Sequence, residues 1–103
     1  MSDIEITALC ADAMEIAVFE REDFSGRLEI RHVNGTNTIY EPLHDDAQAL
    51  ALVKQVVLDI HCRADMNGWY VGRARLHEGL TTNADLNRAI CYAVAGIQAE
   101  RTK

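Results

Sequence analysis

Residues 40–60, YEPLHDDAQALALVKQVVLDI, decide the predicted fold, because they combine the only proline of the chain, a helix start and the densest apolar run. Pro42 cannot donate a ladder hydrogen bond, so it ends a preceding strand. Asp45 or Asp46 can accept hydrogen bonds from the free N–H groups of a helix that begins beside them. We therefore predict a helix over residues 44–56. Its narrow polar face indicates that it packs on more than one side, as the central packing element.

A hairpin is predicted before this helix. Leu28 and Ile30 alternate with charged residues, which is typical of a half-buried strand. The residues predicted to face water are Arg27, Glu29 and Arg31. Asn34-Gly35 follows, and this dipeptide favours a type I′ turn. Residues 36–41 should then return antiparallel.

A second hairpin is predicted after the helix. A strand is expected from Leu58, because the run is β-branched and alternates with polar residues. A second Asn-Gly pair, Asn67-Gly68, precedes a polar-interrupted strand over residues 69–77. Residues 78–83, EGLTTN, are interpreted as a loop.

Helices are predicted at both ends of the chain. Ser2 and Glu5 have the spacing of a capping box, which starts a helix near Asp3. Thr82 and Asp85 have the same spacing before a final helix. That helix carries apolar residues at three- and four-residue steps, from Leu86 to Ile97.

The predicted order is therefore helix, hairpin, helix, hairpin, helix, in a single α+β domain over residues 1–103. Isolated two-stranded hairpins are marginal, so the four strands are expected to form one small antiparallel sheet flanked by helices, an α/β/α sandwich. A chain of 103 residues buries about two thirds of its surface, enough for one core.

Charge is distributed unevenly along the chain. The net charge is −6; eleven acids against three arginines give −8 in residues 1–46, and five acids against seven basic residues give +2 in residues 47–103. Nucleic-acid binding is disfavoured unless four arginines converge: Arg63, Arg73, Arg75 and Arg88. The acidic half suits a basic protein partner, and the candidate binding residues there are Glu20, Glu22 and Asp23. The alternative is a solvated surface that aids solubility.

A second candidate binding patch combines aromatic and basic residues after Asn67-Gly68. Trp69, Tyr70, Arg73 and Arg75 are residue types enriched at interfaces. The alternative is that Trp69 simply packs on the core.

Catalytic and metal-binding patterns are absent from the sequence. Four histidines are scattered without a second ligand at a recognised spacing: His32, His44, His61 and His77. Three cysteines lie far apart among apolar residues, as free core thiols do: Cys10, Cys62 and Cys91. The acids of His44-Asp45-Asp46 are explained by the helix start. We therefore predict no enzyme, no catalytic residues, no metal and no cofactor.

The sequence resembles a class of small bacteriophage and prophage proteins. The resemblance is carried by LCADAMEI near the N-terminus, by YEPLHDDAQALALVKQ, by GWYVGRA and by LNRAIC in the last helix. It spans most of the chain except residues 18–33, and the chain looks like the phage "ABA sandwich" type. The resemblance implies helices on both sides of a small antiparallel sheet, and that family has no assigned catalytic residues.

Three functions follow as hypotheses. The preferred one is a non-enzymatic phage or prophage accessory protein that acts by binding a host or phage protein, with inhibition of a host factor and formation of a homodimer as further expectations. A small-ligand or metal-binding domain with a cleft near His61, His77 and Trp69 is the second, and a virion or assembly component is the third. No run approaches the roughly 18 apolar residues of a membrane span, and MSDIEITALC does not resemble a signal peptide. We therefore expect a location in the host cytosol.

Overall fold

Three helices and six strands alternate along the part of the chain that the computed structural model describes, residues 1–20, 27–63, 68–73 and 78–101. The α+β class predicted from the sequence is confirmed. The elements are α1 (Asp3–Ala13), β1 (Phe19–Glu20), β2 (Leu28–Arg31), β3 (Asn37–Tyr40), α2 (Asp46–Val56), β4 (Asp59–Arg63), β5 (Gly68–Arg73), β6 (Glu78–Asn83) and α3 (Leu86–Arg101).

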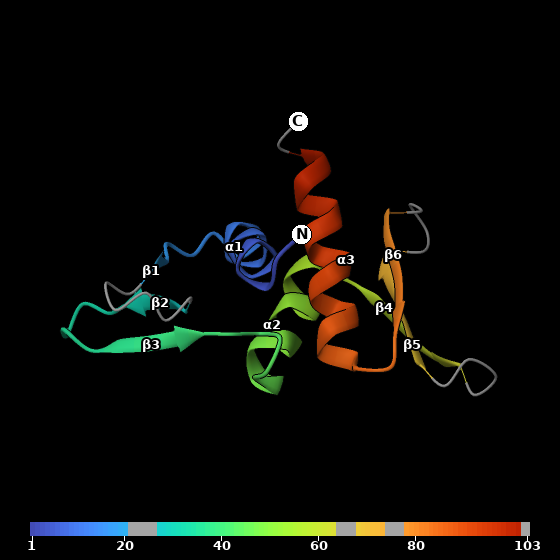
Figure 1. The fold of residues 1–103 in the computed structure, drawn as a ribbon, viewed down its shortest axis with the longest axis horizontal. Helices are drawn as coiled ribbons and strands as arrows, with labels where there is room; N and C mark the ends of the chain where they lie inside the picture. The colour runs from blue at the N-terminus through green and yellow to red at the C-terminus, as the bar shows by residue number, and fades with distance from the viewer. Residues whose placement is uncertain (21–26, 64–67, 74–77, 102–103) are drawn as a thin grey trace.

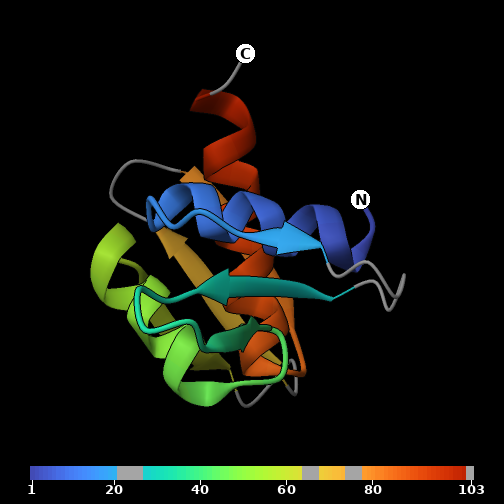
Figure 2. The ribbon, with the colours of Figure 1, turned by 90° about the vertical axis from the view of Figure 1, so that its left-hand side faces the viewer.

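The strands form two antiparallel sheets, ordered β1-β2-β3 and β4-β5-β6. The helices lie between them: Figure 1 shows the first sheet on the left, the helices in the centre and the second sheet on the right. Figure 2, which faces the first sheet, shows α1 above it, α2 at its lower left and α3 behind. The structure thus has two sheets around the helices where one sheet between helices was predicted.

The side chain of Gln48 occupies the edge of β3 that faces away from β2. Its Oε1 accepts a hydrogen bond from the backbone N–H of Glu41 at 2.7 Å, and its Nε2 donates to the carbonyl of Ile39 at 2.9 Å. These backbone groups belong to the outer edge of β3, where another strand would have to pair. An α2 side chain therefore protects this edge, in the way that natural sheets cover their edges.

The first hairpin has the predicted antiparallel arms but a different turn, and its register is shifted by one residue from that of a type I′ turn at Asn34-Gly35. Residues 28–31 pair with residues 37–40, and the N–H of Gly35 donates to the carbonyl of His32 at 3.0 Å. Gly35 has φ +88°, whereas Asn34 does not have a positive φ. A type I′ turn needs a positive φ at both central residues, so the loop is instead a three-residue connection that ends in a left-handed glycine.

Glu29 was predicted to face water, and this is wrong. Its side chain is only 5% exposed. The physical reason is its position on the middle strand of the sheet, where it lies directly between Phe19 and Ile39 in register. Side chains opposite one another on adjacent strands are about 5 Å apart, so these two apolar neighbours cover it.

The segment interpreted as a loop, residues 78–83, is the edge strand β6. It pairs antiparallel with β5, with an irregularity between Val71 and Arg73, and it packs against α3. The polar sequence of this segment did not indicate a strand, because β6 is stabilised by backbone pairing and by packing against a helix. Of the second predicted turn, Asn67 lies outside the described residues, whereas Gly68 belongs to β5 and pairs with Arg63.

Capping side chains fix the helix starts. Ser2 accepts from the N–H of Glu5 at 3.2 Å, and Asp45 accepts from the N–H of Gln48 at 2.9 Å, so both predicted caps are confirmed. The helix α2 begins at Asp46, two residues later than predicted, because Asp45 is its cap. Asp85, not Thr82, caps α3: its carboxylate accepts from the N–H of Asn87 at 3.1 Å. Thr82 cannot cap because it belongs to β6.

The core is built around α3, not around α2 as predicted. One side of α3 packs on β5 and β6, and the other side packs on α1 and α2. Seven residues of α3 are buried, compared with three of α2. Several of the seven are small, so neighbouring backbones can approach closely; they are Ala89, Ile90, Cys91, Ala93, Val94, Ala95 and Ile97.

Candidate functional site

One face of α2 carries an apolar stripe that is open to solvent. Leu50, Val53 and Val57 follow one another at three- and four-residue steps, which places them on one face of the helix. Leu50 is 51% exposed and Val57 is 72% exposed. We call these three residues the α2 stripe. Figure 2 shows α2 at the lower left margin of the molecule.

A groove lies beside the α2 stripe, with a volume of about 450 Å³. Its walls come from α2, from α3 and from β4. The apolar residues that line it are Ala49, Leu50, Val53, Ile60, Leu86 and Ile90. The surface therefore offers an apolar ridge and an apolar depression next to each other, a shape that suits docking of another protein element.

One end of the groove is acidic. Asp46, Asp85 and Asn87 line it there. The side chain of Asn87 donates to Asp46 Oδ1 at 2.8 Å, while its backbone N–H donates to Asp85 Oδ1 at 3.1 Å. Asn87 thus holds together two carboxylates, one from the start of α2 and one from the start of α3. Lys54 is exposed near the other end of α2, so the surface has opposite charges at its two ends.

Val57 ends α2 in an unusual backbone conformation. Its φ of 59° and ψ of 61° lie in the left-handed region, which a β-branched residue rarely adopts. The N–H groups of Val57 and Leu58 both donate to the carbonyl of Val53, as at helix ends where glycine is usual. An exposed valine is therefore held where glycine would be less strained, and it extends the α2 stripe by one residue.

Of the three residues of the predicted acidic site, the structure describes one. Glu20 is exposed at the end of β1, opposite Leu28. Glu22 and Asp23 lie outside the described residues, and so does Arg75 of the aromatic patch.

The aromatic residues of the second predicted patch point to opposite faces of the second sheet. Trp69 and Tyr70 are adjacent on β5, so their side chains alternate. Trp69 packs against the core, as its alternative reading stated. Tyr70 lies opposite His61 in register, and their ring centroids are 6.3 Å apart. Arg73 ends the same strand. Among the described residues of the patch, Trp69 and Tyr70 therefore do not share one surface.

One of the arginines considered for nucleic-acid binding, Arg88, already binds other side chains of the same protein. Arg88 Nη1 lies 3.2 Å from Asp3 Oδ1 and 2.8 Å from the hydroxyl of Tyr92. Its guanidinium therefore joins α3 to the start of α1, and a phosphate would have to compete with Asp3 for it.

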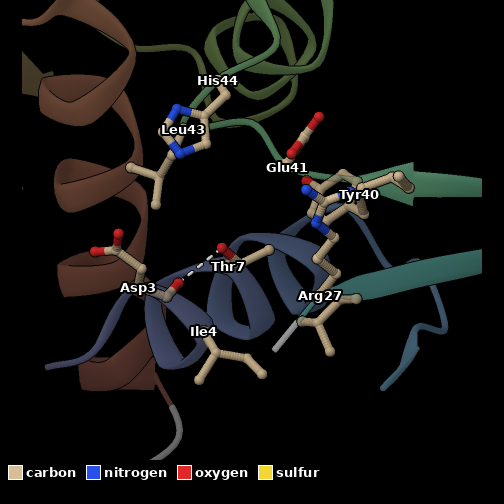
Figure 3. A pocket seen from close by; sticks show the side chains of 10 residues that line it. Asp3, Ile4, Thr7, Arg27, Tyr40, Glu41, Leu43 and His44 are labelled. Carbon is tan, nitrogen blue, oxygen red and sulfur yellow. Dashed lines mark hydrogen bonds between the residues drawn. The ribbon is translucent and has the colours of Figure 1, made fainter. Parts of the chain in front are cut away.

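A second cavity, of about 260 Å³, opens between the start of α1, the first sheet and the segment before α2. Figure 3 shows Arg27, Glu41 and His44 around its mouth, with Thr7 donating to the backbone carbonyl of Asp3. It is remote from Trp69 and His61, where the sequence placed a ligand cleft.

The histidines do not assemble into a metal site in the described part of the chain. No group of three or more His, Cys, Asp or Glu side chains there is arranged to hold a metal ion. His32 Nε2 lies 2.7 Å from the hydroxyl of Thr38, and His61 contacts Tyr70. His77 lies outside the described residues.

Cys10 and Cys91 meet in the core between α1 and α3. Both are fully buried free thiols, and Cys10 Sγ lies 3.7 Å from the carbonyl oxygen of Cys91. The hydrogen bond with Cys91, followed by burial, raises the pKa of Cys10. Burial, and then the nearby Cys10 and Cys91, raise the pKa of the Tyr40 phenol, which is 4% exposed. Cys10 and Tyr40 are therefore held in their neutral forms.

This cluster leads to an expected loss of stability at alkaline pH. Cys10 begins to ionise near its ordinary pKa of 9.0 in the unfolded chain, and Tyr40 near 10.0, while both stay protonated in the folded chain. Stability is thus full below pH 9 and falls above it, by at most about 1.4 kcal/mol per pH unit for each group. Urea unfolding between pH 7 and 10.5 measures this fall. Cys10→Ala should reduce the slope; an unchanged slope contradicts the assignment.

Comparisons with known proteins add no relative. No family model matches the chain, and neither the curated proteins nor the solved structures give a match. None of the described helices is both long and apolar enough to span a membrane.

Sequence reasoning missed the α2 stripe, although its residues were visible in the apolar run. The helix was expected to pack on more than one side, so no exposed apolar stripe was predicted on it. A signal was available in the spacing of Asp46, Leu50 and Lys54, which places two opposite charges on either side of an apolar residue along one helix.

Proposed function

We propose that this chain is a non-enzymatic module that acts by binding another protein chain through the α2 stripe and the groove beside it. One observation supports the proposal above the others: Leu50 and Val57, two large apolar side chains, are exposed on one helix face next to an apolar groove. Apolar residues that are contiguous at the surface, with polar residues around them, mark interaction sites more often than scattered ones do.

The resemblance to small phage proteins supports the wider setting of this proposal. We propose that the protein is a phage or prophage accessory protein that works in the cytosol of its bacterial host, where a host factor or a phage protein is the partner. The negative net charge of −6 favours a partner with a basic contact surface.

Affinity capture with matched variants tests the proposed function. Tagged wild-type chain, Leu50→Glu and Gln55→Glu are each incubated with host lysate, and bound proteins are quantified by mass spectrometry. Gln55 is exposed on the same helix, about half a turn away from the α2 stripe. We expect a partner that is retained by the wild-type chain and by Gln55→Glu, and that Leu50→Glu loses. Equal capture by all three contradicts a role for this face.

A further inference from the structure

We propose that the partner seated on the α2 stripe is a second copy of this chain, in a two-fold symmetric dimer with the two α2 helices antiparallel. The inference rests on the proposed function and names the occupant of the same surface. In such a dimer one patch must be complementary to itself, because each copy presents the same residues to the other.

The shape of the surface meets this requirement. The ridge formed by the α2 stripe lies directly beside the groove that Ala49, Ile60 and Ile90 line. In a two-fold arrangement, the ridge of each copy enters the groove of the other. Helices pack in this way, with side-chain ridges in neighbouring grooves. The groove volume of about 450 Å³ is ample for the side chain of a second Leu50.

The charges on α2 also meet the requirement that the surface be complementary to itself. Asp46 and Lys54 each lie four residues from Leu50, one toward either end of α2, and both are exposed. A two-fold axis near Leu50 therefore brings Asp46 of each copy opposite Lys54 of the other, and this pairing occurs twice. Asp85 stands beside Asp46, held there by Asn87, and adds to the attraction for the incoming ammonium group. A parallel pair of α2 helices would instead place like charges opposite each other.

The dimer is expected to be weak. A helix of 11 residues is about 16 Å long, so the contact is smaller than the roughly 800 Å² per partner of a standard interface. A dissociation constant on the order of 10 µM is expected for a contact of this size. Exposed ion pairs contribute little affinity, so they mainly select the antiparallel orientation.

Sedimentation equilibrium of the full chain from about 1 to 500 µM tests the inference. The weight-average mass should rise from 11.5 kDa toward twice that value. Leu50→Glu should remain monomeric, and Lys54→Glu should weaken the dimer about tenfold, because two attractive pairs become repulsive. The double variant Asp46→Lys with Lys54→Glu should recover dimerisation, whereas Gln55→Glu should dimerise like the wild type. A monomer throughout, or a dimer that Leu50→Glu does not disturb, overturns the inference.

Zero-length carbodiimide crosslinking gives a second readout that needs no variant to fold. The chain has two lysines, Lys54 and Lys103, so crosslinked peptides are few. Asp46 and Lys54 of one copy are about 12 Å apart along the helix, too far for a zero-length link. A mixture of ¹⁴N- and ¹⁵N-labelled chains should yield a mixed-isotope Asp46–Lys54 peptide. Dimers that give links to Lys103 and not this peptide overturn the inference.

The two proposals fail in different ways. If the chain stays monomeric while Leu50→Glu loses a lysate partner, the proposed function stands and the dimer is excluded. If the chain dimerises and lysate capture does not depend on Leu50, the dimer stands and binding of a different protein through this face is excluded.

Discussion

Replacing Leu52 by alanine is expected to lower the free energy of unfolding by about 3 kcal/mol, near the middle of the range for a buried leucine. Leu52 is fully buried on α2, in the core where this helix meets α3. The substitution removes most of the side chain and leaves a cavity, since the surrounding helices cannot collapse fully. Urea unfolding followed by circular dichroism measures the change, at about 1 µM so that self-association does not contribute.

Leu50→Ala is the matched control, because it makes the same chemical change two residues away on the same helix. Leu50 is exposed, so its replacement should change stability by less than about 0.5 kcal/mol. Similar losses of stability for the two variants would mean that the buried face of α2 has been assigned wrongly.

Gln48→Glu is the second large effect, an expected loss of about 2 kcal/mol at pH 7, within the range for an unsatisfied partly buried group. The carboxylate can still accept from the N–H of Glu41. Its other oxygen replaces the amide nitrogen that donates to the carbonyl of Ile39, and two acceptors then face each other. The edge of β3 loses one bond and gains a repulsion, which equilibrium unfolding detects directly.

The pH dependence distinguishes this mechanism from simple loss of packing. In the Gln48→Glu variant, a protonated carboxyl group can donate to the Ile39 carbonyl, so the folded state should favour the protonated form. The loss should therefore be small below pH 4.3, the usual pKa of glutamate, and should grow as the pH rises. Gln55→Glu, an exposed change on the same helix, should lose almost no stability either below pH 4.3 or at pH 7. A loss that does not vary with pH contradicts the bonding role of Gln48.

Short-range signals predicted the helix starts well. Ser2 and Asp45 cap α1 and α2 as their spacing indicated, because capping needs only a side chain and backbone groups within three residues. The two arms of the first hairpin also followed from a local pattern. The turn type did not, because Asn-Gly can occupy more than one kind of short loop and only Gly35 takes the positive φ.

The candidate site could be predicted only in part. The sequence contained the apolar and charged residues of α2, yet it could not say which of them face the core. That depends on how α2 packs against the other helices: Ala49 and Leu52 are buried, whereas Leu50 stays exposed. The acidic pair Asp46 and Asp85 is separated by 39 positions, and only the packing of α2 against α3 brings it together.

By itself, the sequence determined the α+β class, the order of the main helices and hairpins, and the caps that begin α1 and α2, since these depend on interactions within a few residues. The tertiary structure alone decided that the strands divide into two sheets, that β6 is a strand, that α3 forms the centre and that the α2 stripe stays open. The physical reason is that each depends on which distant surfaces bury each other. The amide of Gln48 closes the edge of β3, while the small side chains of α3 let both α1 and the second sheet approach it closely.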